Sequence, residues 1–229
     1  MIIGNGLLAK NFSHYKQNSD VLFFVSGVSN STEVNDKEFS KEEKLLRDSI
    51  YKIDKVLFIY FSSCYVDNVN MLETKYYNHK KAMENIIKDN VSNYIIFRLP
   101  QVVGDGGNNN NLINFLFKSI ENGNEFTLFK HATRNLIDVI DVVKSVDFII
   151  VNNIFINKVI NIASPKNVSI VHIVKKIETI VKRKAQYIEE NKGENIEIDI
   201  SNINYIFNNL KIKFNDSYVS NLLNKYYKI

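Results

Sequence analysis

The segment Tyr76–Glu84 (YYNHKKAME) pairs phenol and ammonium groups at a spacing that suits proton transfer. Tyr76 and Lys80 are four positions apart, so on a helix they share one face. A lysine ammonium beside a phenol favours the phenolate and lowers the pKa of the tyrosine toward the working range of an enzyme. Tyr76 is therefore predicted to exchange the proton that accompanies hydride transfer at a carbonyl or alcohol carbon. Tyr77 and Lys81 have the same spacing and form the rival pair.

A second reactive group stands at the end of a predicted strand. The apolar run Val56–Phe61 (VLFIYF) indicates a buried strand, and it ends on Ser62 and Ser63. In open parallel sheets, ligands bind outside the carboxyl ends of the strands. Because Ser63 precedes the Tyr76 helix, its hydroxyl is expected to contact the same substrate oxygen as Tyr76.

The chain begins with a glycine turn, Gly4–Ala9 (GNGLLA), directly after an apolar pair. Glycines at these places let a pyrophosphate approach the backbone at the start of a helix. The residues predicted to hold a dinucleotide there are Gly4, Asn5, Gly6, Leu7 and Leu8. The acidic residue that usually binds the adenosine ribose is missing, since Asp20 precedes the next strand instead of ending it. The sequence therefore predicts NAD or NADP without distinguishing them.

The elements that position these residues alternate between short apolar runs and segments of helical period. The predicted strands are Ile2–Ile3, Val21–Val25, Val56–Phe61, Tyr94–Leu99, Phe126–Phe129 and Val159–Ile162. The predicted helices are Leu7–Tyr15, Lys37–Tyr51, Lys75–Lys88, Leu112–Asn122, one from about Val139, Ser169–Arg183 and one beginning in Ser201–Asn209. This alternation predicts an α/β protein with a Rossmann-like, doubly wound parallel sheet, trimmed on the adenosine side.

The loop Gly104–Asn111 (GDGGNNNN) is expected to separate two parts of the chain. Residues 1–104 would form the dinucleotide-binding part with the catalytic residues. Residues 105–229 would form mainly a small C-terminal substrate-binding lobe, interleaved with the sheet.

Composition excludes several other classes of protein. With 229 residues, 45% of them apolar, the chain can bury a core without disulfides or metals. Its one cysteine, Cys64, and four scattered histidines predict no metal site. The net charge of +4 is spread along the chain, and its one tight basic cluster, Lys182–Lys184, is expected to be a solvated helix end rather than a nucleic-acid site. No apolar run is long enough to cross a membrane and no signal peptide is recognised, so a cytoplasmic protein is expected.

Taken together, these segments resemble the extended short-chain dehydrogenase/reductase superfamily, in its NAD(P)-dependent nucleotide-sugar epimerase/dehydratase/reductase branch. The segments that carry the resemblance are GNGLLA, FFVSGVSNS, FSSCYVD, YYNHKKAMEN, FRLPQVVG and RNLIDVIDV. The spacing of Lys80 and Glu84 matches the KxxxE pattern of the family and favours Tyr76 over Tyr77. The resemblance implies that Ser63, Tyr76 and Lys80 are catalytic, with Lys80 also on the nicotinamide ribose.

Further site residues follow from the same resemblance. Those expected beside the cofactor are Val25, Ser26, Gly27, Ser62, Pro100 and Val102, together with Tyr76 and Lys80. Those expected beside the substrate are Ser29, Ser63, Gln101 and Arg134, with the Arg134 guanidinium on a nucleotide diphosphate. A homodimer built from the helices at 37–51 and 75–88 is also implied.

The resemblance also limits which reactions of this branch the chain could catalyse. Dehydratases of this branch carry an acidic pair after the catalytic hydroxyl, whereas this chain has Cys64 and Tyr65 there. Reduction or epimerisation remains. The leading hypothesis is an NAD(P)-dependent reductase of a 4-keto (6-deoxy) nucleotide sugar in cell-surface polysaccharide biosynthesis. A nucleotide-sugar epimerase using the same residues and a non-catalytic NAD(P)- or nucleotide-binding regulator are the alternatives.

Overall fold

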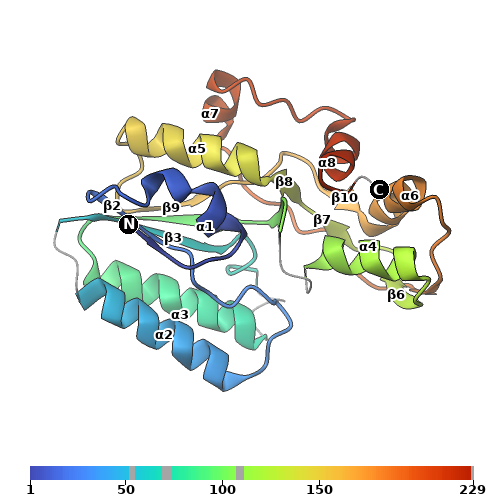
Figure 1. Ribbon diagram of the computed structural model, residues 1–229, viewed down its shortest axis with the longest axis horizontal. Helices are drawn as coiled ribbons and strands as arrows, with labels where there is room; N and C mark the ends of the chain where they lie inside the picture. The colour runs from blue at the N-terminus through green and yellow to red at the C-terminus, as the bar shows by residue number, and fades with distance from the viewer. Residues whose placement is uncertain (52–54, 69–73, 107–110, 228–229) are drawn as a thin grey trace.

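A five-stranded parallel sheet forms the centre of the molecule (Figure 1). The computed structural model describes residues 1–51, 55–68, 74–106 and 111–227. In spatial order the strands are β1 (Ile2–Ile3), β2 (Val21–Phe24), β3 (Leu57–Ser63), β4 (Tyr94–Leu99) and β9 (Lys158–Asn161). All four neighbouring pairs are parallel, so the predicted Rossmann-like sheet is confirmed.

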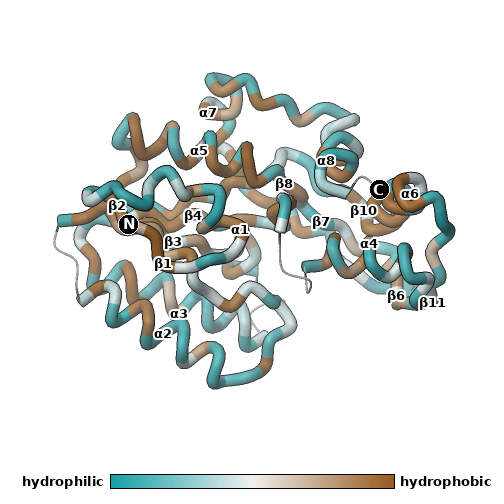
Figure 2. The backbone as a smooth tube through the Cα atoms, in the orientation of Figure 1, coloured by the Kyte–Doolittle hydropathy of each residue, from teal (hydrophilic) through white to brown (hydrophobic). Residues whose placement is uncertain are grey.

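Helices cover both faces of this sheet. On one face lie α1 (Leu7–Asn11), a 3₁₀ turn (Ser13–Tyr15) and α5 (Val139–Val151); on the other lie α2 (Asp36–Tyr51) and α3 (Lys75–Asn90) (Figure 1). Every residue of β3 is buried, and its side chains alternate between the two apolar cores. Figure 2 shows the consequence: the strands are predominantly hydrophobic, whereas α2 and α3 are largely hydrophilic with hydrophobic positions at intervals.

The predicted trimming of the adenosine side is visible in the strand order. In a full dinucleotide-binding sheet, strand 1 has neighbours on both sides. Here β1 is an edge strand among the described residues, and the order β1-β2-β3-β4 simply follows the chain. Because α1 and α2 lie on opposite faces, the β1–α1–β2 and β2–α2–β3 connections have opposite hands, although nearly all such connections are right-handed. The strands that would extend the sheet beyond β1 are absent between residues 4 and 20.

The second part of the chain builds a separate apolar core from α4 (Leu112–Asn122), α6 (Ile170–Val181) and α8 (Tyr218–Tyr226). Three strand pairs accompany these helices: β5 (Gln101–Val103) with β8 (Leu136–Asp138), β6 (Phe126–Phe129) with β11 (Tyr187–Glu190), and β7 (Thr133–Arg134) with β10 (Val168–Ser169). The short helix α7 (Asn204–Asn209) packs near α5.

The sequence did not predict β5, β7, β8, β10, β11 or α8. The five strands in this list have only two to four residues, which is too short to show a period, and distant partners decide their pairing. Residues 107–110 of the predicted loop lie outside the described residues, and the boundary at residue 104 stays a prediction. No helix in the described ranges combines the length and the apolar character needed to cross a membrane.

Candidate active site

A cavity of about 1180 Å³ opens at the carboxyl ends of β1 to β4. Its volume exceeds the range of about 300–1,000 Å³ that is usual for one small ligand, which leaves room for a cofactor and a substrate together. The predicted site residues that line it are Asn5, Gly6, Leu7, Leu8, Val25, Ser26, Gly27, Ser29, Ser62, Ser63, Tyr76, Lys80, Pro100, Gln101, Val102 and Arg134. Ser63 and Tyr76, from two different elements, thus face one cavity, as the catalytic hypothesis requires.

Gly4 is the one predicted site residue that does not line the cavity. Its φ of 133° lies in the region that favours glycine, and a Cβ there would come within 2.6 Å of the Val25 carbonyl oxygen. Gly4 therefore lets the turn pass close to the end of β2. Gly6, at the N-terminal end of α1, has open space where its Cβ would be and is free to admit a ligand.

The two serines at the end of β3 are both buried, yet their hydroxyls differ. Ser63 Oγ accepts a hydrogen bond from the Tyr65 backbone N–H at 3.3 Å. Ser62 Oγ has no hydrogen-bond partner among the described residues. An unsatisfied buried hydroxyl costs about 1–3 kcal/mol, so this atom in a cavity wall suits a polar ligand.

The first turns of α3 decide between the two tyrosine–lysine pairs. Thr74 caps the helix by accepting a hydrogen bond from the Tyr77 N–H. Tyr76 and Lys80 both line the cavity, with Nζ of Lys80 5.8 Å from the centre of the Tyr76 ring. Lys81 is absent from the cavity lining and forms an ion pair with Asp67 instead. The arrangement favours Tyr76 with Lys80.

One expectation about this pair is wrong. Lys80 was expected to lower the pKa of Tyr76, but burial and the negative charge of Glu42 raise that pKa. The physical reason is that Lys80 Nζ donates to Glu42 Oε1 at 2.9 Å, so the ammonium is already paired with a carboxylate. Tyr76 therefore remains a protonated phenol.

Glu42 is the residue that the sequence reading missed. It lies on α2 with 4% of its surface exposed, and it lines the cavity beside Lys80. The sequence did contain a signal for this residue. Glu42 falls between Phe39 and Leu46 on the buried stripe of the helix, where an apolar residue is the usual choice.

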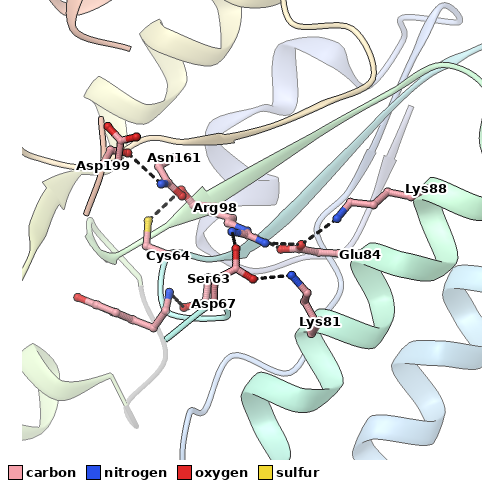
Figure 3. Close-up of polar contacts among 10 residues, drawn as sticks. Ser63, Cys64, Asp67, Lys81, Glu84, Lys88, Arg98, Asn161 and Asp199 are labelled. Carbon is pink, nitrogen blue, oxygen red and sulfur yellow. Dashed lines mark hydrogen bonds and ion pairs between the residues drawn. The ribbon is translucent and has the colours of Figure 1, made fainter. Parts of the chain in front are cut away.

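A second charge network, centred on the buried Arg98–Glu84 pair, fixes the loop after β3 (Figure 3). Arg98, on β4, donates from Nε and Nη2 to the two carboxylate oxygens of Glu84, at 2.8 and 2.7 Å. It also pairs through Nη1 with Asp67, which in turn pairs with Lys81. Cys64 Sγ donates to the Arg98 carbonyl at 3.2 Å, and burial raises the pKa of this thiol. The loop that follows Ser63 is therefore tied to both β4 and α3.

The opposite wall of the cavity comes from the second part of the chain. Arg134 is half-buried and donates from Nη1 to the Thr133 carbonyl oxygen at 2.7 Å. Tyr65 faces it, with its ring 6.4 Å from that of Tyr77 in an edge-to-face contact. Aromatic and guanidinium groups together provide surfaces for a sugar ring and for phosphate oxygens.

A sequence profile of the NAD dependent epimerase/dehydratase family matches residues 30–163, more than half of the chain. The protein belongs to this family. The predicted family and enzyme class are thereby confirmed, and so is the dependence on a nicotinamide dinucleotide. No curated protein sequence matches the chain significantly.

Solved structures of similar fold support the architecture of this epimerase/dehydratase family member. The PbgP3 protein of Burkholderia pseudomallei has a TM-score of 0.74 at 16% identity over 98% of this chain and 81% of its own. RMD of Pseudomonas aeruginosa, complexed with NADPH, has a TM-score of 0.69 at 13% identity, over 89% of this chain and 91% of its own. UDP-glucuronic acid 4-epimerase of Bacillus cereus, in complex with UDP-glucuronic acid and NAD, has a TM-score of 0.68 at 17% identity, over 96% of this chain and 76% of its own. At sequence identities this low, the structural similarity establishes the fold alone.

The cavity of this family member fits the cofactor that the family uses. Gly6 leaves space at the backbone turn, and the Ser62 hydroxyl has no hydrogen-bond partner in the part of the chain that the structure describes. Gly27 lets the backbone of the cavity wall lie close to the Glu42–Lys80 pair, since a Cβ there would be 2.8 Å from both Glu42 Oε1 and Lys80 Nζ. The backbone at Gly27 thus covers the Glu42–Lys80 pair directly, with no side chain between them.

Proposed function

We propose that the protein is an NAD(P)H-dependent reductase of a 4-keto (6-deoxy) nucleotide sugar, serving cell-surface polysaccharide biosynthesis. The observation that carries this proposal is that the Tyr76 side chain lines the same cavity as Ser63, while burial and Glu42 raise the pKa of its phenol. A ketone that accepts hydride needs a proton on its oxygen. A tyrosine whose pKa is raised by burial and by Glu42 is suited to donate that proton.

Each side chain has a role in the reduction that follows from its position in the cavity. When bound, the nicotinamide cofactor supplies the hydride. Ser63 would donate a hydrogen bond to the keto oxygen, and Tyr76 would give it a proton. Lys80 would hold the nicotinamide ribose, while the turn at Gly6 and Leu7 would hold the pyrophosphate. Arg134 would bind the diphosphate of the substrate as a bidentate donor.

The test is the stoichiometry of the purified protein with 4-keto-6-deoxy nucleotide sugars. We expect one NADPH or NADH to be consumed for each reduced sugar formed, followed by cofactor absorbance and by chromatography of the sugar. Conversion of a nucleotide sugar without net consumption of cofactor would reject the reductase.

An epimerase is the second candidate, because the family profile and several similar structures bear that name. The same Ser63, Tyr76 and Lys80 would first oxidise and then reduce one carbon. Tyr76 would then have to begin as a base, which a raised pKa disfavours. Interconversion of UDP-sugar epimers with the cofactor retained would establish this alternative.

We also propose that the protein is a homodimer formed through α2 and α3. Helix α2 carries two exposed apolar side chains, Leu45 and Tyr51. Light scattering should give twice the chain mass, and Leu45→Glu should shift it to the monomer.

A further inference from the structure

The Glu42 carboxylate collects four hydrogen bonds from three separate parts of the chain. Oε1 accepts from Lys80 Nζ at 2.9 Å and from the Tyr60 hydroxyl at 3.0 Å. Oε2 accepts from the Val28 backbone N–H at 2.8 Å and from His79 Nε2 at 3.0 Å. Helix α3, strand β3 and the loop after β2 therefore meet on one buried carboxylate.

Burial of a carboxylate costs several kcal/mol unless its oxygens are satisfied. Here burial acts to raise the pKa of Glu42, but the Lys80 charge and the hydrogen bonds from His79, Lys80 and Val28 lower it to about 2. Glu42 is therefore ionised at neutral pH. A permanent charge at this place balances Lys80, one of three charged side chains among the described cavity-lining residues, with Glu42 and Arg134.

The position of the Lys80 ammonium follows from these bonds. Nζ lies 3.4 Å from the Tyr60 hydroxyl, which accepts from Lys80 and donates to Glu42. Nζ also lies 5.5 Å from the centre of the Tyr60 ring. Without Glu42, a long lysine side chain would have several rotamers open to it in a cavity of this size.

The titratable groups near Tyr76 come from three elements of the chain. Glu42 faces it from α2, Tyr60 from β3, and Lys80, His79 and Tyr77 share α3 with it. Glu84 acts on Tyr60 from the next turn of α3. Glu42 is the carboxylate among them whose charge acts on the Tyr76 phenol.

We propose that Glu42 is a positioning residue of the reductase site: it holds the Lys80 ammonium in one place beneath Gly27 and balances its charge beside Tyr76. This inference rests on the proposed function for its kinetic consequence. Its structural part, the fixing of Lys80, does not depend on which reaction the enzyme performs.

The first experiment measures the reactivity of Lys80 without any assay of turnover. The protein is acylated with trace acetic anhydride at pH 8, and the labelling rate of each lysine is read by mass spectrometry. In Glu42→Gln we expect Lys80 to react at least tenfold faster, because its amine is no longer held against a carboxylate and the side chain can move toward the reagent in the cavity. Lys81, paired with Asp67, should keep its rate.

The matched control is Glu43→Gln, since Glu43 is the next residue on α2 but its side chain is 42% exposed and pairs with Arg47. It should leave Lys80 labelling unchanged. An unchanged Lys80 rate in a folded Glu42→Gln protein overturns the proposal. If that variant does not fold, Glu42→Asp is used instead, because it keeps the negative charge on a side chain that is one methylene group shorter. Glu42→Asp should raise the labelling rate of Lys80 at least threefold, and an unchanged rate again overturns the proposal.

The second experiment follows kcat against pH. The loss of activity at high pH, where Tyr76 would lose its proton, should move to lower pH by about one unit or more in Glu42→Gln, because a negative charge near the phenol is removed. A profile that does not move contradicts the charge-balancing role. If no reductase activity is found, the labelling result still decides whether Glu42 fixes Lys80, so the two failures are distinguishable.

Discussion

Lys80 and Tyr76 lie one turn apart on α3, yet the ammonium of Lys80 bonds to Glu42, and its Nζ is 5.8 Å from the centre of the Tyr76 ring. The pairing of the Lys80 ammonium with a carboxylate, beside the phenol it accompanies, determines how the site can act. The lysine is fixed for binding, while the tyrosine keeps its proton. A site arranged in this way favours donation of a proton to a substrate oxygen.

Replacement of the phenol tests this arrangement. Tyr76→Phe should lower kcat by about 10²–10⁴-fold, because a positioned general acid contributes about that much. Dinucleotide binding and the melting temperature should change little, since the ring remains in place. Tyr77→Phe is the matched control and should cost less than tenfold. Full activity in a folded Tyr76→Phe protein would contradict the acid role of Tyr76. Absence of turnover in the wild type, with dinucleotide binding unchanged by the substitution, would support the regulator hypothesis.

The pKa of Glu42 predicts a specific dependence of stability on pH. Its folded-state pKa of about 2 lies below the usual 4.5, so its stabilising contribution is complete above pH 4.5 and is lost as pH falls toward 2. The difference in pKa corresponds to about 3 kcal/mol. Urea unfolding should show wild type more stable than Glu42→Gln at pH 7, with the gap narrowing below pH 4.5. A gap that stayed constant to pH 3 would contradict the prediction.

The two glycines of the first turn should respond differently to alanine. Gly4→Ala places a Cβ 2.6 Å from a backbone oxygen at positive φ, so it should lower the free energy of unfolding by about 1–3 kcal/mol. Gly6→Ala meets open space and should leave stability within about 0.5 kcal/mol, apart from the helix end. Its methyl group would instead intrude on the cofactor and weaken NADH binding, measured by calorimetry. Equal effects on stability would show that the turn is not built as described.

The Arg98–Glu84 pair should show strong coupling. Arg98→Met leaves the fully buried Glu84 carboxylate without its main partner and should cost about 3–5 kcal/mol of unfolding free energy. The double variant Arg98→Met/Glu84→Leu removes both charges and should recover a large part of that loss. Urea denaturation of the two single variants and the double variant gives the coupling energy. Additive losses would mean that the two groups act independently.

The edge position of β1 predicts weak discrimination between the two nicotinamide cofactors. Asp20, at the start of β2, lies at the end of the sheet away from the cavity, so no acidic side chain after β1 selects the free ribose hydroxyl. Dissociation constants for NADH and NADPH should agree within about tenfold, since no single charged contact separates them. A preference above a hundredfold would require a selecting residue elsewhere in the chain.

Local sequence patterns were sufficient for the elements of the sheet half. Strands buried on both faces, such as Leu57–Ser63, appear as continuous apolar runs, and α2 and α3 show a helical period, so both kinds of element can be recognised without their partners. The glycine turn and the Tyr76–Lys80 spacing are local as well. These features allowed the fold class and the family resemblance to be predicted, and every predicted site residue except Gly4 lines the cavity.

Only the tertiary structure decided the electrostatics of the site. The charge that sets the state of Tyr76 comes from Glu42, 34 positions earlier in the chain, and reaches it through the packing of α2 against α3. Electrostatic interactions depend on distance and burial in space, and a sequence pattern records neither. The sequence by itself therefore identified a set of residues that face the cavity, while the fold added Glu42 and determined that the lysine arrives there already paired and the tyrosine still protonated.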